Sequence, residues 1–307
     1  MGSKRGGKKG AGARLIERFR VTDGKGFRLS RCNSAETAGL EKKDAEERLE
    51  LGVQRLAGLQ EQLYAQDRWG VLLIFQAMDA AGKDGAIEHV MSGVNPQGCQ
   101  VHAFKAPSLE ELDHDFLWRT ARALPERGRI GIFNRSHYEE LLVVRVHPEL
   151  LERQHLPRKP AGDALWRQRA HDIAAWETHL AHNGVAIAKF FLNVSKAEQR
   201  KRFEARLAEP AKHWKFRLAD VEERAHWNAY QRAYQDAIAR TAAPHAPWYV
   251  VPADSKWFLR LVVLAVLIET LEALDLQFPR VTGQRKEELV QARALLAAEK
   301  RSGRGAR

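Results

Sequence analysis

The sequence predicts an α/β protein built around a parallel β-sheet. Largely apolar runs of strand length, typical of strands buried on both faces, occur at 71–77, 130–133 and 185–194. Segments with helical spacing of apolar residues separate these runs, and 163–182 is the clearest of them. Strands joined by helices of this length need right-handed crossovers, so neighbouring strands should run parallel.

The chain opens with a basic segment, and a long helix follows. Residues 1–14 and 300–307 are rich in Gly, Lys and Arg, a composition typical of disordered tails. Residues 15–35 should wrap the surface, and the apolar spacing over 36–65 predicts one long or broken amphipathic helix. We therefore expect a single folded domain over 15–299.

A buried strand, a phosphate-binding loop and a helix start follow one another between Val71 and Ile87. Residues 77–85 read Ala-Met-Asp-Ala-Ala-Gly-Lys-Asp-Gly; in such a loop the backbone N–H groups, the helix dipole and the lysine ammonium attract phosphate. A Gly-Lys pair alone would equally fit a glycine-capped helix start, but the flanking strand and helix favour the phosphate loop. The residues expected to contact phosphate are Ala80, Ala81, Gly82, Lys83, Asp84 and Gly85.

Three positions depart from the usual P-loop pattern. Ala77 stands where the first glycine is common, and Asp84 stands where a Ser or Thr would ligate Mg²⁺. Asn134 ends the predicted strand 129–134, at a point where a carboxylate would reach the metal. An amide oxygen can also bind Mg²⁺, although it is a weaker ligand than a carboxylate.

The remaining predicted elements complete the sheet and its helices. Pro107-Ser108, followed by two glutamates, predicts a helix start, and Asn183-Gly184 predicts the end of helix 163–182. Residues 143–160 are expected to be irregular. The further strands are predicted at 99–104 and 247–252, and the further helices at 109–123 and 257–274.

Residues 196–240, between the last two predicted strands, are strongly charged and helical. Ser195 is a typical N-cap residue, and Glu209-Pro210 interrupts the helical pattern. P-loop kinases of the nucleotide-kinase type carry a lid in this position, whereas a solvated helical hairpin is the alternative for a charged segment. Trp214 favours the lid, because it lies between lysines and needs a surface to bury it.

Composition narrows the class of protein. The net charge of +11 and the isoelectric point of about 9.8 predict a polyanionic partner. No apolar run reaches the ~20 residues that span a bilayer, and no apolar signal segment opens the chain, so we expect neither membrane insertion nor export. The two isolated cysteines indicate neither a disulfide framework nor a zinc site, which favours the cytoplasm.

Five segments together resemble the family-2 polyphosphate kinases. They read Gln-Ala-Met-Asp-Ala-Ala-Gly-Lys-Asp-Gly at 76–85, Ser-Gly-Val-Asn-Pro-Gln-Gly at 92–98, Phe-Asn-Arg-Ser-His-Tyr-Glu at 133–139, Lys-His-Trp-Lys at 212–215 and His-Ala-Pro-Trp-Tyr at 245–249. Their order along the chain is that of the family, which is far more specific than the P-loop alone. The resemblance implies a three-layer α/β/α P-loop kinase fold with a helical lid over about 196–240.

The resemblance also implies an activity. Members of the family move a terminal phosphoryl group between inorganic polyphosphate and a nucleotide, reversibly and with Mg²⁺. For this chain the resemblance implies polyphosphate, AMP, ADP and ATP as ligands and assembly into a dimer or tetramer. We expect neither a nucleic-acid nor a membrane partner.

The catalytic residues implied by the resemblance are Asp79, Lys83 and Arg135. The expected Mg²⁺ ligands are Asp79 and, from its place at the strand end, Asn134, while Asp84 could reach the metal through water. Arg135 is a planar donor suited to charge that develops on phosphoryl oxygens. Asn95 would contact the nucleotide. The lid cations implied to hold the polymer are Arg200, Arg206, Lys212 and Lys215.

Two further positions bear on the substrates. Glu139 is the residue that members accepting both AMP and ADP tend to have, whereas asparagine is typical of ADP-restricted members; the alternative is a helix-start glutamate favoured by the dipole. Lys256 follows the last predicted strand at the sheet edge where ligands bind, so we expect it to contact phosphate.

Three other functions remain open from the sequence. The first is a polyphosphate kinase restricted to ADP or GDP. The second is an ATP-dependent nucleoside kinase, against which Asp84 and the density of lid cations argue. The third is a non-catalytic P-loop protein that binds polyanions. Only Asn134 and the basic tails support this function.

Overall fold

The computed structural model of the protein describes residues 15–158 and 162–302, except for the side chains of Lys212, Lys215 and residues 300–302. The predicted tail 1–14 and most of the predicted tail 300–307 lie outside the described residues. Contacts divide the chain into one unit that ends at Leu276 and a second that begins at Gln277. The predicted domain 15–299 spans the described part of the first unit and most of the second.

A six-stranded sheet in the order β1-β6-β5-β2-β4-β3 forms the centre of the first unit. All neighbouring pairs from β6 to β3 are parallel, which confirms the predicted α/β fold with a parallel sheet. The positions predicted for these strands agree closely with the observed ones. The parallel strands are β2 (Gly70–Ala77), β3 (Cys99–Ala103), β4 (Ile130–Asn134), β5 (Val185–Asn193) and β6 (Trp248–Pro252).

The edge strand β1 (Arg20–Val21) runs antiparallel to β6 and makes the sheet mixed. The sequence analysis expected residues 15–35 only to wrap the surface. The structure shows that this segment also contributes a strand to the sheet. Ile16, Phe19 and Leu29 from this segment are buried in the core. A two-residue strand shows no alternation of polar and apolar positions, so the hydrophobic pattern cannot reveal it.

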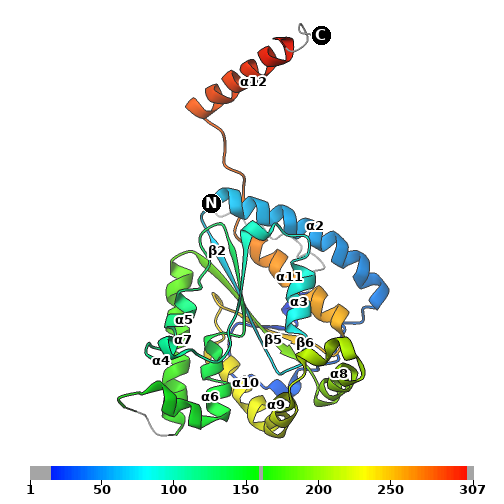
Figure 1. Ribbon diagram of the computed structural model, residues 1–307, viewed down its shortest axis with the longest axis vertical. Coiled ribbons are helices and arrows are strands. Elements are labelled where there is room, and N and C mark those ends of the chain that lie inside the picture. The colour runs from blue at the N-terminus through cyan, green and yellow to red at the C-terminus, as the bar shows by residue number, and fades with distance from the viewer. Residues whose placement is uncertain (1–14, 159–161, 303–307) are drawn as a thin grey trace, which may run out of the picture. The chain divides into compact units, whose positions relative to one another are not determined.

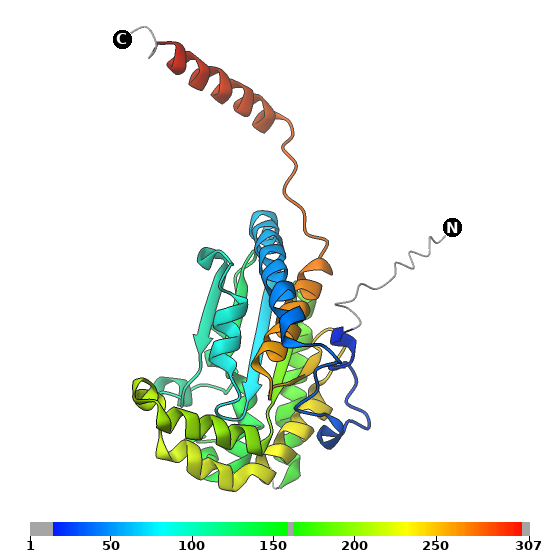
Figure 2. The same ribbon diagram turned by 90° about the vertical axis from the view of Figure 1, so that its right-hand side faces the viewer.

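Helices cover both faces of the sheet in three layers (Figures 1 and 2). On one face α11 (Lys256–Glu272) packs against α2 (Lys42–Gln66) and α3 (Lys83–Val90). On the other face α7 (Asp163–His182) contacts β5 and α10 (Trp227–Thr241). Helix α11 has nine buried residues, because it lies between α2 and the sheet.

The helix predicted over 109–123 is broken into α4 (Leu109–Leu112) and α5 (Trp118–Ala121). Ser108 caps the first of these in a capping box, as its position predicted. Asp115 ends the continuity, because its Oδ1 accepts a hydrogen bond from the Leu117 N–H at 2.9 Å and starts a new turn.

The segment 143–160 is also more regular than predicted. It contains a helical turn, α6 (Val143–Val146), and a 3₁₀ helix, η4 (Pro148–Gln154). Short helical turns of this length carry too few apolar repeats to stand out in a sequence.

The charged segment after β5 folds into α8 (Lys196–Ala208), η5 (Pro210–Lys215), α9 (Leu218–Glu222), η6 (Glu223–His226) and α10. Figure 2 shows α8 and its neighbours beyond the carboxyl ends of the parallel strands, where a lid is expected. Helix α10 belongs partly to the core, since Tyr230 and Tyr234 are buried. Trp214 is 78% exposed, so the prediction that it would be buried was wrong.

The second unit contains one helix, α12 (Gln284–Ser302), among its described residues. Neither this helix nor any other within 15–158 and 162–302 is long and apolar enough to cross a bilayer.

A charged cluster in the core joins β5, α7 and η3 (His137–Glu140). Lys189, fully buried on β5, donates from Nζ to Glu177 on α7, to the Tyr138 hydroxyl at 3.0 Å and to the Thr241 carbonyl at 2.8 Å. Burial lowers the pKa of Lys189, and the adjacent Glu177 carboxylate opposes that shift. Burial tends to raise the pKa of Glu177, but Lys189 and His137 outweigh this effect and lower that pKa.

We expect Lys189→Met to destabilise the protein by about 3–5 kcal/mol, because it leaves the buried Glu177 carboxylate without its cation. Urea unfolding followed by circular dichroism measures the change. The double variant Lys189→Met/Glu177→Leu should recover most of the loss, since no buried charge remains. A single variant within about 1 kcal/mol of the wild type contradicts this account of the cluster.

Candidate functional site

The P-loop follows β2 at the carboxyl edge of the sheet. Gly82 is the N-cap of α3 with φ of 105°, a left-handed conformation that glycine adopts without strain. The loop closes through hydrogen bonds from the Ala81 N–H to the Met78 carbonyl at 3.2 Å and from the Ala86 N–H to the Gly82 carbonyl at 3.0 Å. The first N–H groups of α3 lack partners within the helix, which makes this end a site for anions.

Helix α8 holds the carbonyl groups of the same loop. Arg202, only 8% exposed, donates to the carbonyl oxygens of Ala80 and Ala81 at 3.1 and 2.7 Å. It also donates to the carbonyls of Ala253 and Asp254 after β6. Gln199 donates from Nε2 to the Asp79 carbonyl at 2.8 Å. These hydrogen bonds from α8 satisfy the carbonyl groups of Asp79, Ala80 and Ala81.

A cleft of about 1180 Å³, named here the P-loop cleft, opens between this loop and the segment 202–220. It brings together most of the predicted site. The predicted residues that line it are Asp79, Ala80, Ala81, Gly82, Lys83, Asp84, Gly85, Asn134, Arg135, Arg206 and Lys256. Its lining also includes cations that sequence reasoning missed, namely Lys105, Arg217 and Arg260.

The predicted catalytic residues are neighbours in the cleft. Arg135 Nη2 lies 3.0 Å from Asp79 Oδ1, and the two side chains form an ion pair. The backbone of Arg135 is left-handed, with φ of 64°, and its N–H donates to the Phe75 carbonyl at 3.0 Å. Such a conformation costs energy in a residue with a side chain, so the surrounding hydrogen bonds must hold it.

Charges around Arg135 set the ionisation of the site. Burial and the Arg135 cation lower the pKa of Lys83, whereas Asp79 and Glu139 oppose the shift. Burial also tends to lower the pKa of Arg135, but Glu139 and Asp79 outweigh it and raise that pKa. Lys83 Nζ donates to the Ala77 carbonyl at 3.2 Å, which places its ammonium across the start of the loop.

Glu139 is half-buried and tied to the strand that precedes the P-loop. With the Gln76 amide oriented to satisfy both of its ends, Nε2 donates to Glu139 Oε1 at 2.9 Å and Oε1 accepts from Ser136. Burial raises the pKa of Glu139, and the Arg135 and Lys83 cations oppose this. The carboxylate therefore acts electrostatically on Lys83 and Arg135, which a helix-start role alone does not require.

The carboxylates of the cleft fit a divalent metal shared with phosphates. Mg²⁺ in phosphate-transfer sites takes one or two carboxylates and completes its shell with phosphate oxygens and water. Asp79 and Asp84 both line the cleft, while within the described residues no three His, Cys, Asp or Glu side chains converge on one point. Asn134 Nδ2 donates to Asp84 Oδ1 at 2.7 Å, so the amide nitrogen of Asn134 faces this carboxylate.

Other predicted site residues are not brought to the cleft. Asn95 is exposed and caps the turn η2 (Pro96–Gly98), where its side chain accepts from the Gln97 N–H at 3.0 Å. Arg200 is exposed and pairs with Glu204 at 2.7 Å along α8. The side chains of Lys212 and Lys215, which belong to η5, lie outside the described part of the chain.

Known proteins are similar to this chain in sequence and in fold. Residues 39–279 match the family described as Polyphosphate kinase 2 (PPK2). The chain is 52% identical over 282 residues to the ADP-polyphosphate phosphotransferase of Rhodopseudomonas palustris, covering 91% of this chain and 98% of the relative. It is 44% identical over 267 residues to the AMP/ADP-polyphosphate phosphotransferase of Meiothermus ruber, covering 86% and 96%. The crystal structure of polyphosphate kinase 2 from Arthrobacter aurescens TC1 aligns with a TM-score of 0.83 at 40% identity, covering 92% of this chain and 96% of that one.

Proposed function

The chain belongs to the polyphosphate kinase 2 family, and we propose that it transfers the terminal phosphoryl group of inorganic polyphosphate to ADP and AMP, reversibly. Relatives that match nearly the whole chain are named for transfers of this kind. The observation that carries the proposal for this chain is the meeting of Lys83, Arg135 and Asp79 in one cation-lined cleft. A cleft of this kind fits a phosphate polymer at its reacting end.

The transfer needs no covalent intermediate with the protein. The terminal phosphate oxygen of the nucleotide attacks the terminal phosphorus of polyphosphate in line, and the shortened polymer leaves. Lys83 and Arg135 stabilise the charge on the transferring group, while Asp79 orients the Arg135 guanidinium. The attacking phosphate is largely ionised near pH 7, so a general base is not needed.

We propose Mg²⁺ as the cofactor, held by Asp79 and Asp84. Bound there, the ion would supply positive charge that neutralises the phosphates. Asn134, which its place at the strand end suggested as a direct ligand, would orient Asp84 through the hydrogen bond from its amide nitrogen. Chelation should abolish turnover and added Mg²⁺ should restore it.

Cations along the P-loop cleft would hold the polymer by its repeating charges. Arg206 and Arg217 line the cleft from the lid side, and Lys105, Lys256 and Arg260 line it from the sheet edge and α11. Binding of a polyanion to such a row releases counterions, so the KM for long polyphosphate should rise steeply with salt.

Glu139 is the residue that we propose favours AMP. AMP is one phosphate shorter than ADP, so its attacking oxygen reaches the polymer only when the nucleotide lies deeper. Glu139 acts on Arg135 and Lys83, the groups that position those phosphates. We expect Glu139→Asn to lower kcat/KM for AMP by about tenfold more than for ADP.

Initial rates with each nucleotide at saturating polyphosphate measure this ratio. Glu88→Gln is the matched control, because Glu88 lines the same cleft from α3 and is exposed. An equal loss for both nucleotides would refute the assigned role of Glu139.

The assembly and the compartment are further parts of the proposal. We propose that the protein acts in the cytoplasm as a dimer or tetramer. Family resemblance supports the assembly, and the two isolated cysteines support a reducing compartment. Light scattering of the purified protein measures the subunit number.

A single assay tests the activity. Purified protein is incubated with Mg²⁺, long-chain polyphosphate and AMP, ADP or GDP, and the nucleotides are then separated. We expect ADP and ATP to form from AMP and ADP. Absence of both products, with ATP-dependent phosphorylation of a nucleoside instead, would overturn the proposal in favour of a nucleoside kinase.

A further inference from the structure

The turn that carries Arg135 out of β4 needs support from the residues beneath it. This segment, residues 135–140, is named here the Arg135 turn and ends in the 3₁₀ helix η3. At its start the Arg135 backbone is left-handed, and its N–H donates to the Phe75 carbonyl at 3.0 Å. A residue with a side chain keeps such a conformation only where the surrounding structure holds it. The position of the Arg135 guanidinium in the P-loop cleft therefore depends on the anchors of the turn.

Helix α7 and strand β5 provide the first anchor, at Tyr138. This fully buried residue of the turn donates from its hydroxyl to Glu177 on α7 at 2.7 Å, and the hydroxyl accepts from Lys189 on β5 at 3.0 Å. Lys189 also donates to Glu177 and to the Thr241 carbonyl. The Tyr138 ring packs edge-on against Trp248, with the ring centroids 4.8 Å apart. Both the ring and the hydroxyl of Tyr138 are thus fixed by neighbours in the core.

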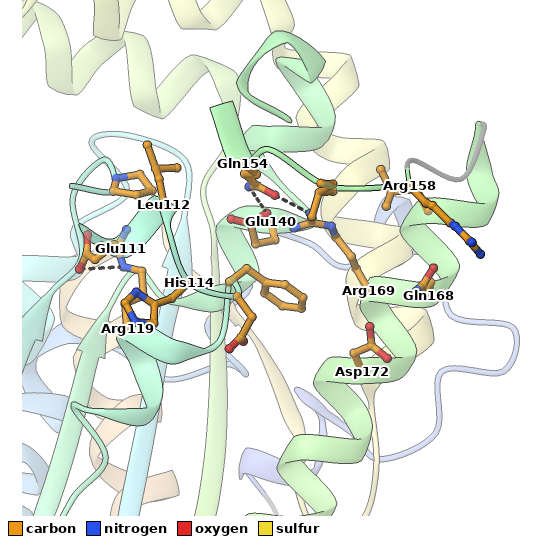
Figure 3. Close-up of a pocket in the computed structure, with 15 residues that line it drawn as sticks. Glu111, Leu112, His114, Arg119, Glu140, Gln154, Arg158, Gln168, Arg169 and Asp172 are labelled. Atoms are coloured by element: carbon orange, nitrogen blue, oxygen red, sulfur yellow. Dashed lines mark hydrogen bonds and ion pairs between the residues drawn. The ribbon is translucent and has the colours of Figure 1, made fainter. Parts of the chain in front are cut away.

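Helix α7 also holds the end of the turn, at Glu140. This carboxylate pairs with Arg169 on α7 and accepts from Gln154 Nε2 at 2.9 Å. Figure 3 shows these three side chains side by side. Arg169 and Glu177 lie about two helical turns apart on α7, which is about 12 Å along its axis. Because the two contacts are well separated, they fix the orientation of the Arg135 turn as well as its position.

The ion pair in the first anchor is better suited to fixing a position than to stabilising the fold. A buried ion pair stabilises a fold little in comparison with apolar residues of the same volume, because both charges lose their hydration. Its hydrogen bonds are directional, however, so it favours one arrangement of its partners. Glu177 and Lys189 are fully buried, and neither is among the described residues that line the P-loop cleft. Their effect on the reaction therefore has to pass through the Arg135 turn.

We propose that Tyr138, Glu177 and Lys189 are positioning residues for phosphoryl transfer, because they hold the Arg135 guanidinium where the transferring group forms. The inference rests on the proposed function, since it explains how a residue of that mechanism is held in place. A displacement of about 1 Å at a reacting group can lower a rate by about 100-fold. Because Glu177 and Lys189 do not reach the cleft, their loss should appear in kcat much more than in KM.

Removing the Tyr138 hydroxyl tests the first anchor. Tyr138→Phe keeps the ring against Trp248 and removes only the hydrogen bonds of the hydroxyl. We expect kcat to fall by about tenfold, while the KM values for ADP and for polyphosphate stay within about threefold of the wild type. The matched control is Tyr249→Phe, which should keep the wild-type kcat. Tyr249 is also buried, but it pairs in register with Phe190, next to Lys189, and so lies on the opposite face of the sheet.

The apolar double variant separates positioning from stability. Lys189→Met/Glu177→Leu should recover most of the stability that Lys189→Met loses. Its kcat should nevertheless stay about tenfold below the wild type, since the Tyr138 hydroxyl has lost both charged partners. A role in stability alone predicts instead that kcat recovers together with the free energy of unfolding.

A combination with Arg135→Lys tests whether Tyr138 acts through Arg135. If it does, Tyr138→Phe should lower the kcat of Arg135→Lys by less than about twofold, because the arginine that it positions is already gone. Separate roles would give the full tenfold loss in both backgrounds, and that result contradicts the inference.

Hydrogen exchange followed by mass spectrometry reports on the turn without any turnover. Its N–H groups are bonded locally, from Tyr138 to Ser136 Oγ at 3.1 Å and from Glu139 to the Ser136 carbonyl at 3.1 Å. In Tyr138→Phe and in the apolar double variant, peptides over 134–142 should exchange about tenfold faster than in the wild type. Tyr249→Phe should exchange there as the wild type does.

The outcomes separate this inference from the proposed function. A wild type that transfers no phosphoryl group from polyphosphate refutes the function, and exchange over 134–142 still decides whether the anchor holds the turn. Unchanged exchange in Tyr138→Phe, or a kcat that recovers with stability in the apolar double variant, overturns the inference. If Tyr138→Phe fails to fold, the exchange and kcat of the double variant decide the question.

Discussion

Replacing Lys83 with alanine is expected to lower kcat for phosphoryl transfer by about 10³-fold or more. The Lys83 ammonium lies across the start of the P-loop, where it bonds to the Ala77 carbonyl at 3.2 Å. No other lysine of the loop can take its place, because residues 77–85 contain only this one. The variant loses a point charge that binds both the ground state and the transferring group.

Rapid-quench measurement of a single turnover isolates the chemical step from binding. Lys201→Ala, on the exposed side of α8, removes the same charge outside the cleft and should keep near-normal turnover. Lys83→Arg should retain part of the activity, since it keeps the charge but changes its geometry. Near-normal turnover in Lys83→Ala would remove this residue from the mechanism.

The ionisation of Lys83 also predicts a pH dependence. Its pKa is lowered from the usual lysine value, so the ammonium loses its proton at a lower pH than an exposed lysine does. Activity should therefore decline on the alkaline side before ordinary lysines titrate. In Lys83→Arg this alkaline limb should move to higher pH, because a guanidinium keeps its proton.

Replacing Arg135 with lysine is expected to lower kcat by about 10²–10³-fold while changing the KM for nucleotide much less. A lysine keeps the charge but cannot make two parallel hydrogen bonds to phosphoryl oxygens. It also breaks the geometry of the 3.0 Å ion pair with Asp79. The loss should therefore appear mainly in the chemical step.

A double-mutant cycle with Asp79→Asn tests the pairing. If Asp79 orients Arg135, the two substitutions share one effect, and the double variant should lose about 0.5–3 kcal/mol less than the sum of the single losses. Independent roles would give additive losses, and additivity is the result that contradicts the assigned geometry. Arg217→Lys, at another cation of the same cleft, is the control for a general loss of guanidinium groups.

Much of the fold was predictable because buried parallel strands read as continuous apolar runs. Strands β2, β4 and β5 coincide with such runs almost to the residue. The antiparallel edge strand β1 was missed, since two residues carry no pattern. The break between α4 and α5 depends on the local hydrogen bond of Asp115, which competes with a helical pattern that the sequence shows as continuous.

The site residues that directly follow a strand could be predicted from the sequence. Asp79, Lys83 and Arg135 follow neighbouring parallel strands, and the carboxyl ends of such strands meet at one edge. It was harder to predict which lid cations face the cleft, because Arg200 and Arg202 lie on the same helix and differ only in the side that they face. One signal was available: Phe203 marks the buried side of α8, and Gln199, four residues earlier, shares it. The P-loop partners of Arg202, the carbonyls of Ala80 and Ala81, lie more than a hundred residues away, beyond the reach of any local pattern.

The hydrogen bonds between α8 and the P-loop limit how the active site can open. Arg202 makes four hydrogen bonds to carbonyls of the loop and of the β6–α11 connection, and bonds of a charged donor contribute about 1.5–3 kcal/mol each. A hinge at Ser195 would break all of them at once. A hinge at Glu209-Pro210, after the last helical turn, would break none of these four bonds and would leave α8 on the P-loop. An opening confined to η5 and α9 would therefore leave the P-loop and its hydrogen bonds to α8 in the position that the structure shows.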